Sequence, residues 1–169
     1  MKEINELLSA SRLGDTKEIL ILLKNGTNVN VRNNSGFTPL SRAIVNNKYD
    51  AVRILMDHGA DVNLVYQKKY NALHIATNYS EIDPRIVEII ITKTEDINET
   101  DRPHGNTALW YACHSCYPNG YRIAELLLQN GSKIDVENIY GKTVLDMANQ
   151  RDDTPELKKL LEKYHNERH

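Results

Sequence analysis

A five-residue segment recurs along this chain at nearly constant spacing. Its best-formed copy, Gly-Phe-Thr-Pro-Leu, occupies 36–40, and weakened copies follow at 69–73, 105–109 and 141–145, about 33 to 36 residues apart. A repeat of this length is too small to bury its own apolar face. Neighbouring units must therefore stack to form one continuous core. The sequence predicts an array of similar units with one long exposed surface, on which we expect the function to lie.

A second repeat, out of phase with the first, supports this interpretation. It reads Gly-Thr-Asn-Val-Asn at 26–30 and Gly-Ala-Asp-Val-Asn at 59–63, with related segments at 95–98 and 131–135. About ten residues separate each of these segments from the next Leu of the first repeat, whereas the remainder of the unit varies in length. Insertions are therefore expected within the units and not at their junctions.

Local chemistry predicts that the best-formed unit is a pair of helices. Thr38 can cap free backbone amides, and Pro39 at the first helical position costs no hydrogen bond. Leu40, Ala43 and Ile44 then share one face at helical spacing. Each first helix should pack through such a stripe.

The second helix of that unit is expected from about residue 50 to Gly59, because glycine supplies the left-handed conformation that often ends a helix. An extended loop, here called a finger, should follow at 61–69. Extra residues at 79–84 and 116–120 are expected between the two helices of their units, away from the fingers.

Composition narrows the class of protein. The chain has 169 residues, of which 40% are hydrophobic and 26% charged, which is typical of a folded globular domain and not of a disordered one. A net charge of −2 without a basic run offers no electrostatic source for nucleic-acid binding. No apolar run approaches the roughly 20 residues that span a bilayer, and the N-terminus lacks a secretory pattern. With only two cysteines, no disulfide framework is expected, and we expect a cytoplasmic protein. We also expect the chain to be a monomer on its own.

Three segments resemble ankyrin repeats: Gly-Phe-Thr-Pro-Leu-Ser-Arg-Ala at 36–43, Leu-His-Ile-Ala at 73–76, and Gly-Ala-Asp-Val-Asn at 59–63. The resemblance covers roughly residues 4 to 164. It implies an all-α solenoid of stacked antiparallel helix pairs with projecting hairpin-like loops, forming a single domain at 1–169. Three internal repeats would lie between two degenerate caps, with approximate boundaries at 4–33, 34–66, 67–101, 102–138 and 139–164.

The resemblance also implies that a protein partner contacts the finger tips and the outward positions of each first helix, along a concave face. The candidate partner-binding residues in the fingers are Arg32, Asn34, Tyr66, Lys68, Asp101, His104, Glu137 and Tyr140. Those on the first helices are Arg42, Asn46, Asn78, Tyr111, His114 and Arg151, with Val45, Ile75 and Met147 also facing outward. Tyrosine and arginine are common anchors of protein interfaces. A competing interpretation is that the finger tyrosines only cover neighbouring fingers.

Other residues that suggest chemistry have structural explanations. His74 occupies the position at which the family's imidazole bonds to a neighbouring loop, and Trp110 should pack between repeats. Cys113 and Cys116 have the spacing of a zinc or redox pair, but the sequence lacks further ligands, and Cys113 stands at a small buried position. No phosphate-binding loop, nucleophile elbow or metalloprotease motif is present. We therefore expect no catalytic activity, metal or cofactor.

The sequence thus favours a non-catalytic module that binds a protein and masks or scaffolds it. Two alternatives stay open within this class: an antitoxin-like immunity protein that neutralises a cognate toxin, and a host-directed effector or adaptor. A structural role, in which copies of the chain join to each other, and an enzyme or metal protein built around Cys113 and Cys116 are the rivals from other classes.

Overall fold

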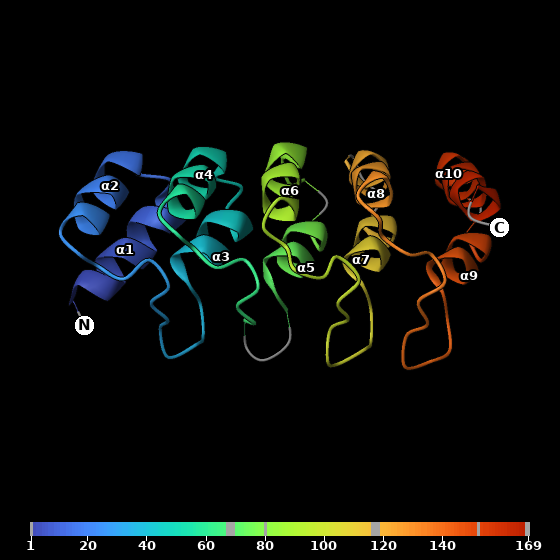
Figure 1. Ribbon diagram of the computed structural model, residues 1–169, viewed down its shortest axis with the longest axis horizontal. Helices are drawn as coiled ribbons and strands as arrows, with labels where there is room; N and C mark the ends of the chain where they lie inside the picture. Colours follow the sequence, from blue (N-terminus) through green and yellow to red (C-terminus); the bar gives the residue numbers. More distant parts are fainter. Residues whose placement is uncertain (1, 67–69, 80, 116–118, 152, 168–169) are drawn as a thin grey trace.

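The computed structural model describes residues 2–66, 70–79, 81–115, 119–151 and 153–167. Ten helices lie in these ranges (Figure 1): α1 (Lys2–Leu13), α2 (Thr16–Lys24), α3 (Pro39–Val45), α4 (Tyr49–Asp57), α5 (Ala72–Thr77), α6 (Pro84–Ile91), α7 (Ala108–His114), α8 (Gly120–Gln129), α9 (Val144–Asn149) and α10 (Pro155–Asn166).

The helices form five antiparallel pairs that stack side by side into an elongated array (Figure 1). The odd-numbered helices make one row, the even-numbered helices make the other, and each helix packs against the corresponding helices of the neighbouring pairs. The described parts of the loops that join successive pairs, called the first to the fourth finger in chain order, project from the row of odd-numbered helices. Among the described residues, the only β pairing is an isolated bridge between Tyr66 and Tyr70. The predicted all-α repeat fold is confirmed.

Each internal first helix begins at a side chain that caps its free amides. The hydroxyl of Thr38 accepts from the Ser41 amide, and Pro39 follows at the first helical position, as the sequence predicts. Equivalent caps are made by Asn71, Thr107 and Thr143. At the other end of the unit, α4 is followed by Gly59 with φ of +85°, a conformation that glycine adopts without strain.

The core is continuous from the first pair to the last. Leu40, Ala43 and Ile44 are at most 2% exposed, so the predicted stripe does face inward. Large side chains at the equivalent positions, such as Leu73 and Leu109, are equally buried against their neighbours. Because each such side chain stabilises the fold by about 1.5 to 3 kcal/mol on burial, contacts between units contribute to stability along the whole array.

The two ends of the array differ. In α10, Leu157, Leu160 and Leu161 are buried against the rest of the array. In α2, the half-buried Glu18 is accompanied by Leu20 and Ile21, which are 42% and 53% exposed. The first pair therefore presents apolar side chains at its outer surface.

Asparagine side chains join successive units. Asn30 donates from Nδ2 to the carbonyl oxygen of Gly59 (3.1 Å), and its Oδ1 accepts from the backbone amide of Asp61 (2.9 Å). The same two bonds recur from Asn63 to Lys93 and Glu95 (3.3 and 3.1 Å) and from Asn98 to Gly131 and Lys133 (3.4 and 2.7 Å). One amide thus satisfies both a backbone acceptor and a backbone donor of the next unit.

These bridges explain the second sequence repeat. Two residues before each bridging asparagine, the side chain of Asn28, Asp61 or Asp96 accepts from the amide of that asparagine at 2.8 to 2.9 Å. Such a local turn fixes the direction of the bridge. The apolar residue between the two packs against the core, most fully in the case of Val62. Each position of the Asp-Val-Asn motif therefore has a separate role.

Replacing Asn63 with Ala should lower the free energy of unfolding by about 1 kcal/mol, because the Lys93 carbonyl and the Glu95 amide of the next unit lose the side chain that bridges them. Chemical denaturation monitored by circular dichroism measures this change. Asn34→Ala is the matched control, since Asn34 is exposed and should change stability by less than about 0.5 kcal/mol. Equal losses in both variants would contradict a bridging role.

Candidate partner-binding face

A small apolar hollow lies between α3 and α5 beside the second finger. Its volume is about 140 Å³. The residues that line it come from α3, α5, the finger between them, the end of the first finger and the segment that follows α5: Phe37, Val45, Tyr66, Tyr70, His74, Ile75, Asn78 and Tyr79. Four of the eight are tyrosine or phenylalanine, which is the composition expected where a protein surface anchors a partner.

Aromatic rings and a cation fix the finger end of the hollow. The rings of Phe37 and Tyr66 lie 4.3 Å apart between centroids, and the guanidinium carbon of Arg42 lies 3.7 Å above the Phe37 ring. This arrangement is a cation–π contact that holds the Arg42 head group at the edge of the hollow. Burial raises the pKa of Tyr66, with Arg42 opposing the shift, so the phenol stays neutral.

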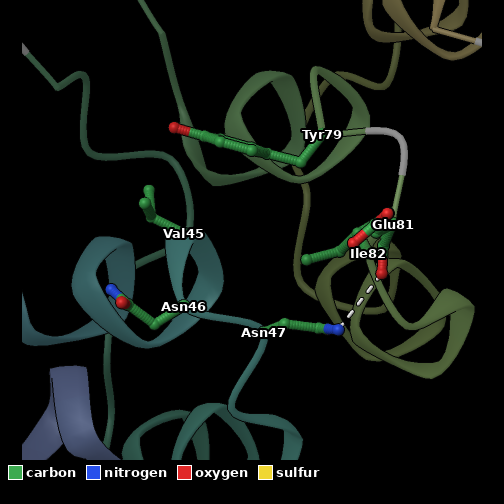
Figure 2. Close-up of a pocket in the computed structure, with 6 residues that line it drawn as sticks. All are labelled: Val45, Asn46, Asn47, Tyr79, Glu81 and Ile82. Carbon is green, nitrogen blue, oxygen red and sulfur yellow. Dashed lines mark hydrogen bonds between the residues drawn. The ribbon is translucent and has the colours of Figure 1, made fainter.

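A second opening continues from this hollow along α3, and Figure 2 shows its walls. Its volume is about 320 Å³, and its lining residues are Val45, Asn46, Asn47, Tyr79, Glu81 and Ile82. Val45 and Tyr79 line both spaces. We call the two together the α3–α5 groove, which runs from the second finger to the extra residues between α5 and α6.

The described residues of the predicted insertion at 79–84 form the far wall of this groove, and residues 81–83 bond to both neighbouring units. Asn47 donates from Nδ2 to the carbonyl oxygen of Glu81 (3.1 Å) and accepts from the amide of Asp83 (2.8 Å). From the other side, Asn119 donates to the carbonyl oxygen of Ile82 (3.0 Å). The backbone of the insertion is therefore placed by its neighbours, and the groove wall is preformed.

Two of the candidate partner-binding residues do not face outward. Tyr111 is 9% exposed and Asp101 is 2% exposed, because the Tyr111 hydroxyl turns into the array and donates to Asp101 Oδ2. The other oxygen of Asp101 accepts from the amide of His104 (2.6 Å) and so shapes the third finger. Burial, and then the bond to Asp101, raise the pKa of Tyr111. The expectation that these two side chains are exposed is wrong, since together they order the finger.

His74 bonds to a neighbouring loop, as its sequence position suggests. Its Nδ1 lies 2.7 Å from Oδ1 of Asn71, and its Nε2 lies 3.0 Å from the carbonyl oxygen of Glu99, just before the third finger. The ring is 2% exposed, and burial lowers the pKa of His74 while Asp101 and Glu99 oppose that shift. His74 thus connects the cap of α5 to the next finger.

Comparison with known proteins agrees with this geometry. A family model described as ankyrin repeats (3 copies) matches residues 5–66 and 73–168. The chain belongs to the ankyrin repeat family. Members of this family generally mediate protein–protein interaction and are typically non-catalytic.

Three relatives show how widely such arrays are used. The chain is 31% identical over 159 residues to a mitochondrial disaggregase of Bos taurus, covering 92% of this chain and 22% of that protein. It is 32% identical over 147 residues to ankyrin repeat and SOCS box protein 6 of Homo sapiens, covering 83% and 34%. It is 31% identical over 134 residues to an ankyrin repeat protein of Fowlpox virus, covering 78% and 39%. The chain thus spans less than half the length of each.

The remaining candidate residues of the ankyrin array divide by exposure. Arg32, Asn34, Asn78, His104, His114, Glu137 and Tyr140 are exposed, and Arg42, Asn46, Tyr66 and Arg151 are half-buried. Lys68 lies outside the described residues. Tyr140 is 68% exposed beside Ile139, which is 63% exposed, so the fourth finger presents an apolar tip. Arg151 donates to the carbonyl oxygen of His114 and pairs with Asp153, which fixes its head group within the array.

Sequence reasoning missed seven residues that line the groove: Phe37, Asn47, Tyr70, His74, Tyr79, Glu81 and Ile82. Phe37 belongs to the repeat motif, yet its ring also lies under the Arg42 guanidinium. Tyr79, Glu81 and Ile82 belong to the insertion, to which the sequence assigns no role. The one signal in the sequence that could have indicated these residues is the extra length of the third unit, because the additional residues lie beside α3.

Of the two cysteines, the structure describes Cys113. Cys113 is fully buried among apolar neighbours, as expected for a small packing residue, and Cys116 lies outside the described residues. In the described part of the chain, no three His, Cys, Asp or Glu side chains gather in a way that could hold a metal ion.

Trp110 is half-buried and packs against the core. None of the helices in those same ranges combines the length and apolar character needed to cross a membrane.

Replacing Tyr111 with Phe should lower the free energy of unfolding by about 1 to 3 kcal/mol, because the buried Asp101 carboxylate loses a hydrogen-bond donor. Thermal and urea unfolding measure the change. Tyr121→Phe is the matched control, since Tyr121 is 41% exposed on α8. If the Tyr111 variant is as stable as the control, the hydroxyl does not support the third finger.

Proposed function

We propose that the chain is a non-catalytic binding module that holds a protein partner against its finger-side face, defined as the α3–α5 groove together with the exposed finger residues. The observation that carries this proposal is the groove itself, a preformed hollow lined by aromatic and apolar side chains next to Arg42. Interface hot spots are typically aromatic residues and arginines in well-packed pockets.

The distribution of exposed aromatic residues supports the same face. Tyr140 at the tip of the fourth finger and Tyr79 at the groove are 68% and 43% exposed. Hydrogen bonds tie neighbouring fingers together, for example from the Ile139 amide to the carbonyl oxygen of His104 (2.9 Å). A surface that is ordered before binding loses little conformational entropy on docking, so more of its contact energy appears as affinity.

Within this function we propose that the module acts by masking: the partner's own binding or active surface is covered while it lies on the array. Partner activity measured with increasing amounts of the chain should then fall to near zero at a one-to-one ratio. An immunity protein would rescue cells that express a toxin from a neighbouring gene. An adaptor or host-directed effector would leave its partner active and would copurify with a host protein.

Replacing Tyr140 with Ala should weaken partner binding by about tenfold or more, because an exposed aromatic anchor is lost. The partner is first captured with the full chain from the source organism and identified by mass spectrometry, and affinities are then measured by biolayer interferometry. Tyr121→Ala on the outer helix α8 is the control and should bind normally. Thermal unfolding of both variants should match that of the wild type. Unchanged affinity for the Tyr140 variant would remove the fourth finger from the interface.

Self-association is a second candidate function, because Leu13, Leu20 and Ile21 leave apolar side chains exposed on the first pair. Under this alternative, copies join through that end. The primary proposal expects a monomer whose sedimentation coefficient does not change with concentration. A concentration-dependent increase that disappears in Leu20→Glu would favour assembly instead.

A further inference from the structure

The α3–α5 groove carries opposite charges at its two ends. Arg42 lies over the Phe37 ring at the finger end, and Glu81 lies in the wall at the other end. Val45, Tyr79 and Ile82 provide the apolar surface between them. In Figure 2, Tyr79 and Ile82 extend from the α5–α6 segment toward the side of the groove formed by Val45.

Neither charge is neutralised within the array. No carboxylate among the described residues lies within ion-pair distance of the guanidinium of Arg42, a half-buried residue whose guanidinium carbon lies 3.7 Å from the centroid of the Phe37 ring. The backbone carbonyl of Glu81 bonds to Asn47, but its exposed carboxylate pairs with no cation in the described ranges. By contrast, Asp83 and Arg85 next to the groove pair with each other at 2.5 Å. The two groove charges are therefore available to a ligand.

The size of the groove indicates what lies between the charges. The hollow of about 140 Å³ is smaller than the roughly 300 to 1,000 Å³ of sites that enclose drug-sized molecules. It suits one apolar side chain. Arg42 and Asn46 are one helical turn apart along α3, which is a rise of about 6 Å and equals about two residues of extended chain. Asn46 lines the same opening as Glu81. A short peptide that starts at Arg42, places an apolar residue in the hollow and continues past Asn46 therefore approaches both charges.

We propose that the α3–α5 groove binds a short extended segment of the partner protein in which an acidic residue meets Arg42, an apolar residue fills the hollow and a basic residue meets Glu81. This inference rests on the proposed function and specifies the partner chemistry at one part of the finger-side face. The carboxylate gains charge-assisted hydrogen bonds from a guanidinium that the Phe37 ring already holds in place. The apolar residue supplies the buried area, and the two charges select the sequence.

The order of charges gives the groove its specificity. A segment with the two charges exchanged would place like charges together at both ends, which disfavours binding. Because Asn47 and Asn119 anchor the wall through the backbone of the insertion, its position does not depend on the Glu81 side chain. The charge at that end can therefore be changed by mutation without moving the wall.

A displayed random peptide library selected on the immobilised full chain tests this inference. We expect enrichment of peptides with an acidic and a basic residue on opposite sides of one large apolar residue. The best peptide is then synthesised with a fluorescent label, and its affinity for each variant is measured by fluorescence polarisation. Arg42→Glu and Glu81→Lys should each weaken it by about tenfold or more. A peptide with its own two charges exchanged should bind best to the Arg42→Glu, Glu81→Lys double variant.

Matched charge changes outside the groove serve as controls. Arg53→Glu on α4 and Glu156→Lys on α10 alter the net charge equally at exposed positions and should leave affinity unchanged. Circular dichroism melting confirms that each variant is folded, and Glu81→Lys retains the test if Arg42→Glu unfolds. The inference is overturned if the library yields no such peptides, or if groove and control variants bind equally.

Failure of the groove inference can be distinguished from failure of the proposed function. If a captured partner loses affinity for the Tyr140→Ala variant but not for the two groove variants, the binding module stands and the groove inference fails. If the peptides depend on Arg42 and Glu81 but no protein partner is held by the array, the groove inference stands and the wider interface fails.

Discussion

The structure depends on the contact between neighbouring helix pairs. Two short helices cannot surround their own apolar residues, so side chains such as Ile44 and Leu73 are buried only because the next pair covers them. Stability therefore accumulates along the array and not around a single centre. Each first helix packs into the core through one face only. The groove between α3 and α5 lies on the other face.

Hydrophobic contact alone would leave the spacing of the pairs loosely defined. The bridges made by Asn30, Asn63 and Asn98 add direction, because each amide must meet one carbonyl and one amide group of the next unit at the same time. On the side of the helix turns, Asn47 likewise meets one carbonyl and one amide group of the next unit, and Asn119 donates to the carbonyl oxygen of Ile82 in the preceding unit. The groove walls are consequently positioned by hydrogen bonds on both sides of the helices.

The features that the sequence predicted well are local. The cap at Thr38, the start at Pro39 and the left-handed Gly59 each depend on a few adjacent residues, so their roles can be inferred from the motif. The errors concern contacts between distant residues. Tyr111 occupies an outward position by helical spacing, yet its long side chain reaches back to Asp101 in the preceding finger.

The candidate site shows the same limit. Arg42, Tyr66 and Asn78 were found because the family pattern marks their positions. The wall that completes the groove was not, since its place is set by Asn47 bonding to residues 34 and 36 positions later. An insertion has no repeat to align with, so its sequence carries no indication of which neighbour will hold it. Only the folded array shows that extra length has become part of a recognition surface.

The succession of bridging amides stops at Asp135, which stands where asparagine is found in the three preceding motifs. A carboxylate lacks the N–H group with which those asparagines donate. The final pair is therefore retained by its buried leucines, by the bond from Arg151 to the carbonyl oxygen of His114 and by the bond from the Ile139 amide to the carbonyl oxygen of His104. In a linear array whose units contact only their neighbours, such a junction is where fraying should start, so α9 and α10 would detach while the groove remains intact.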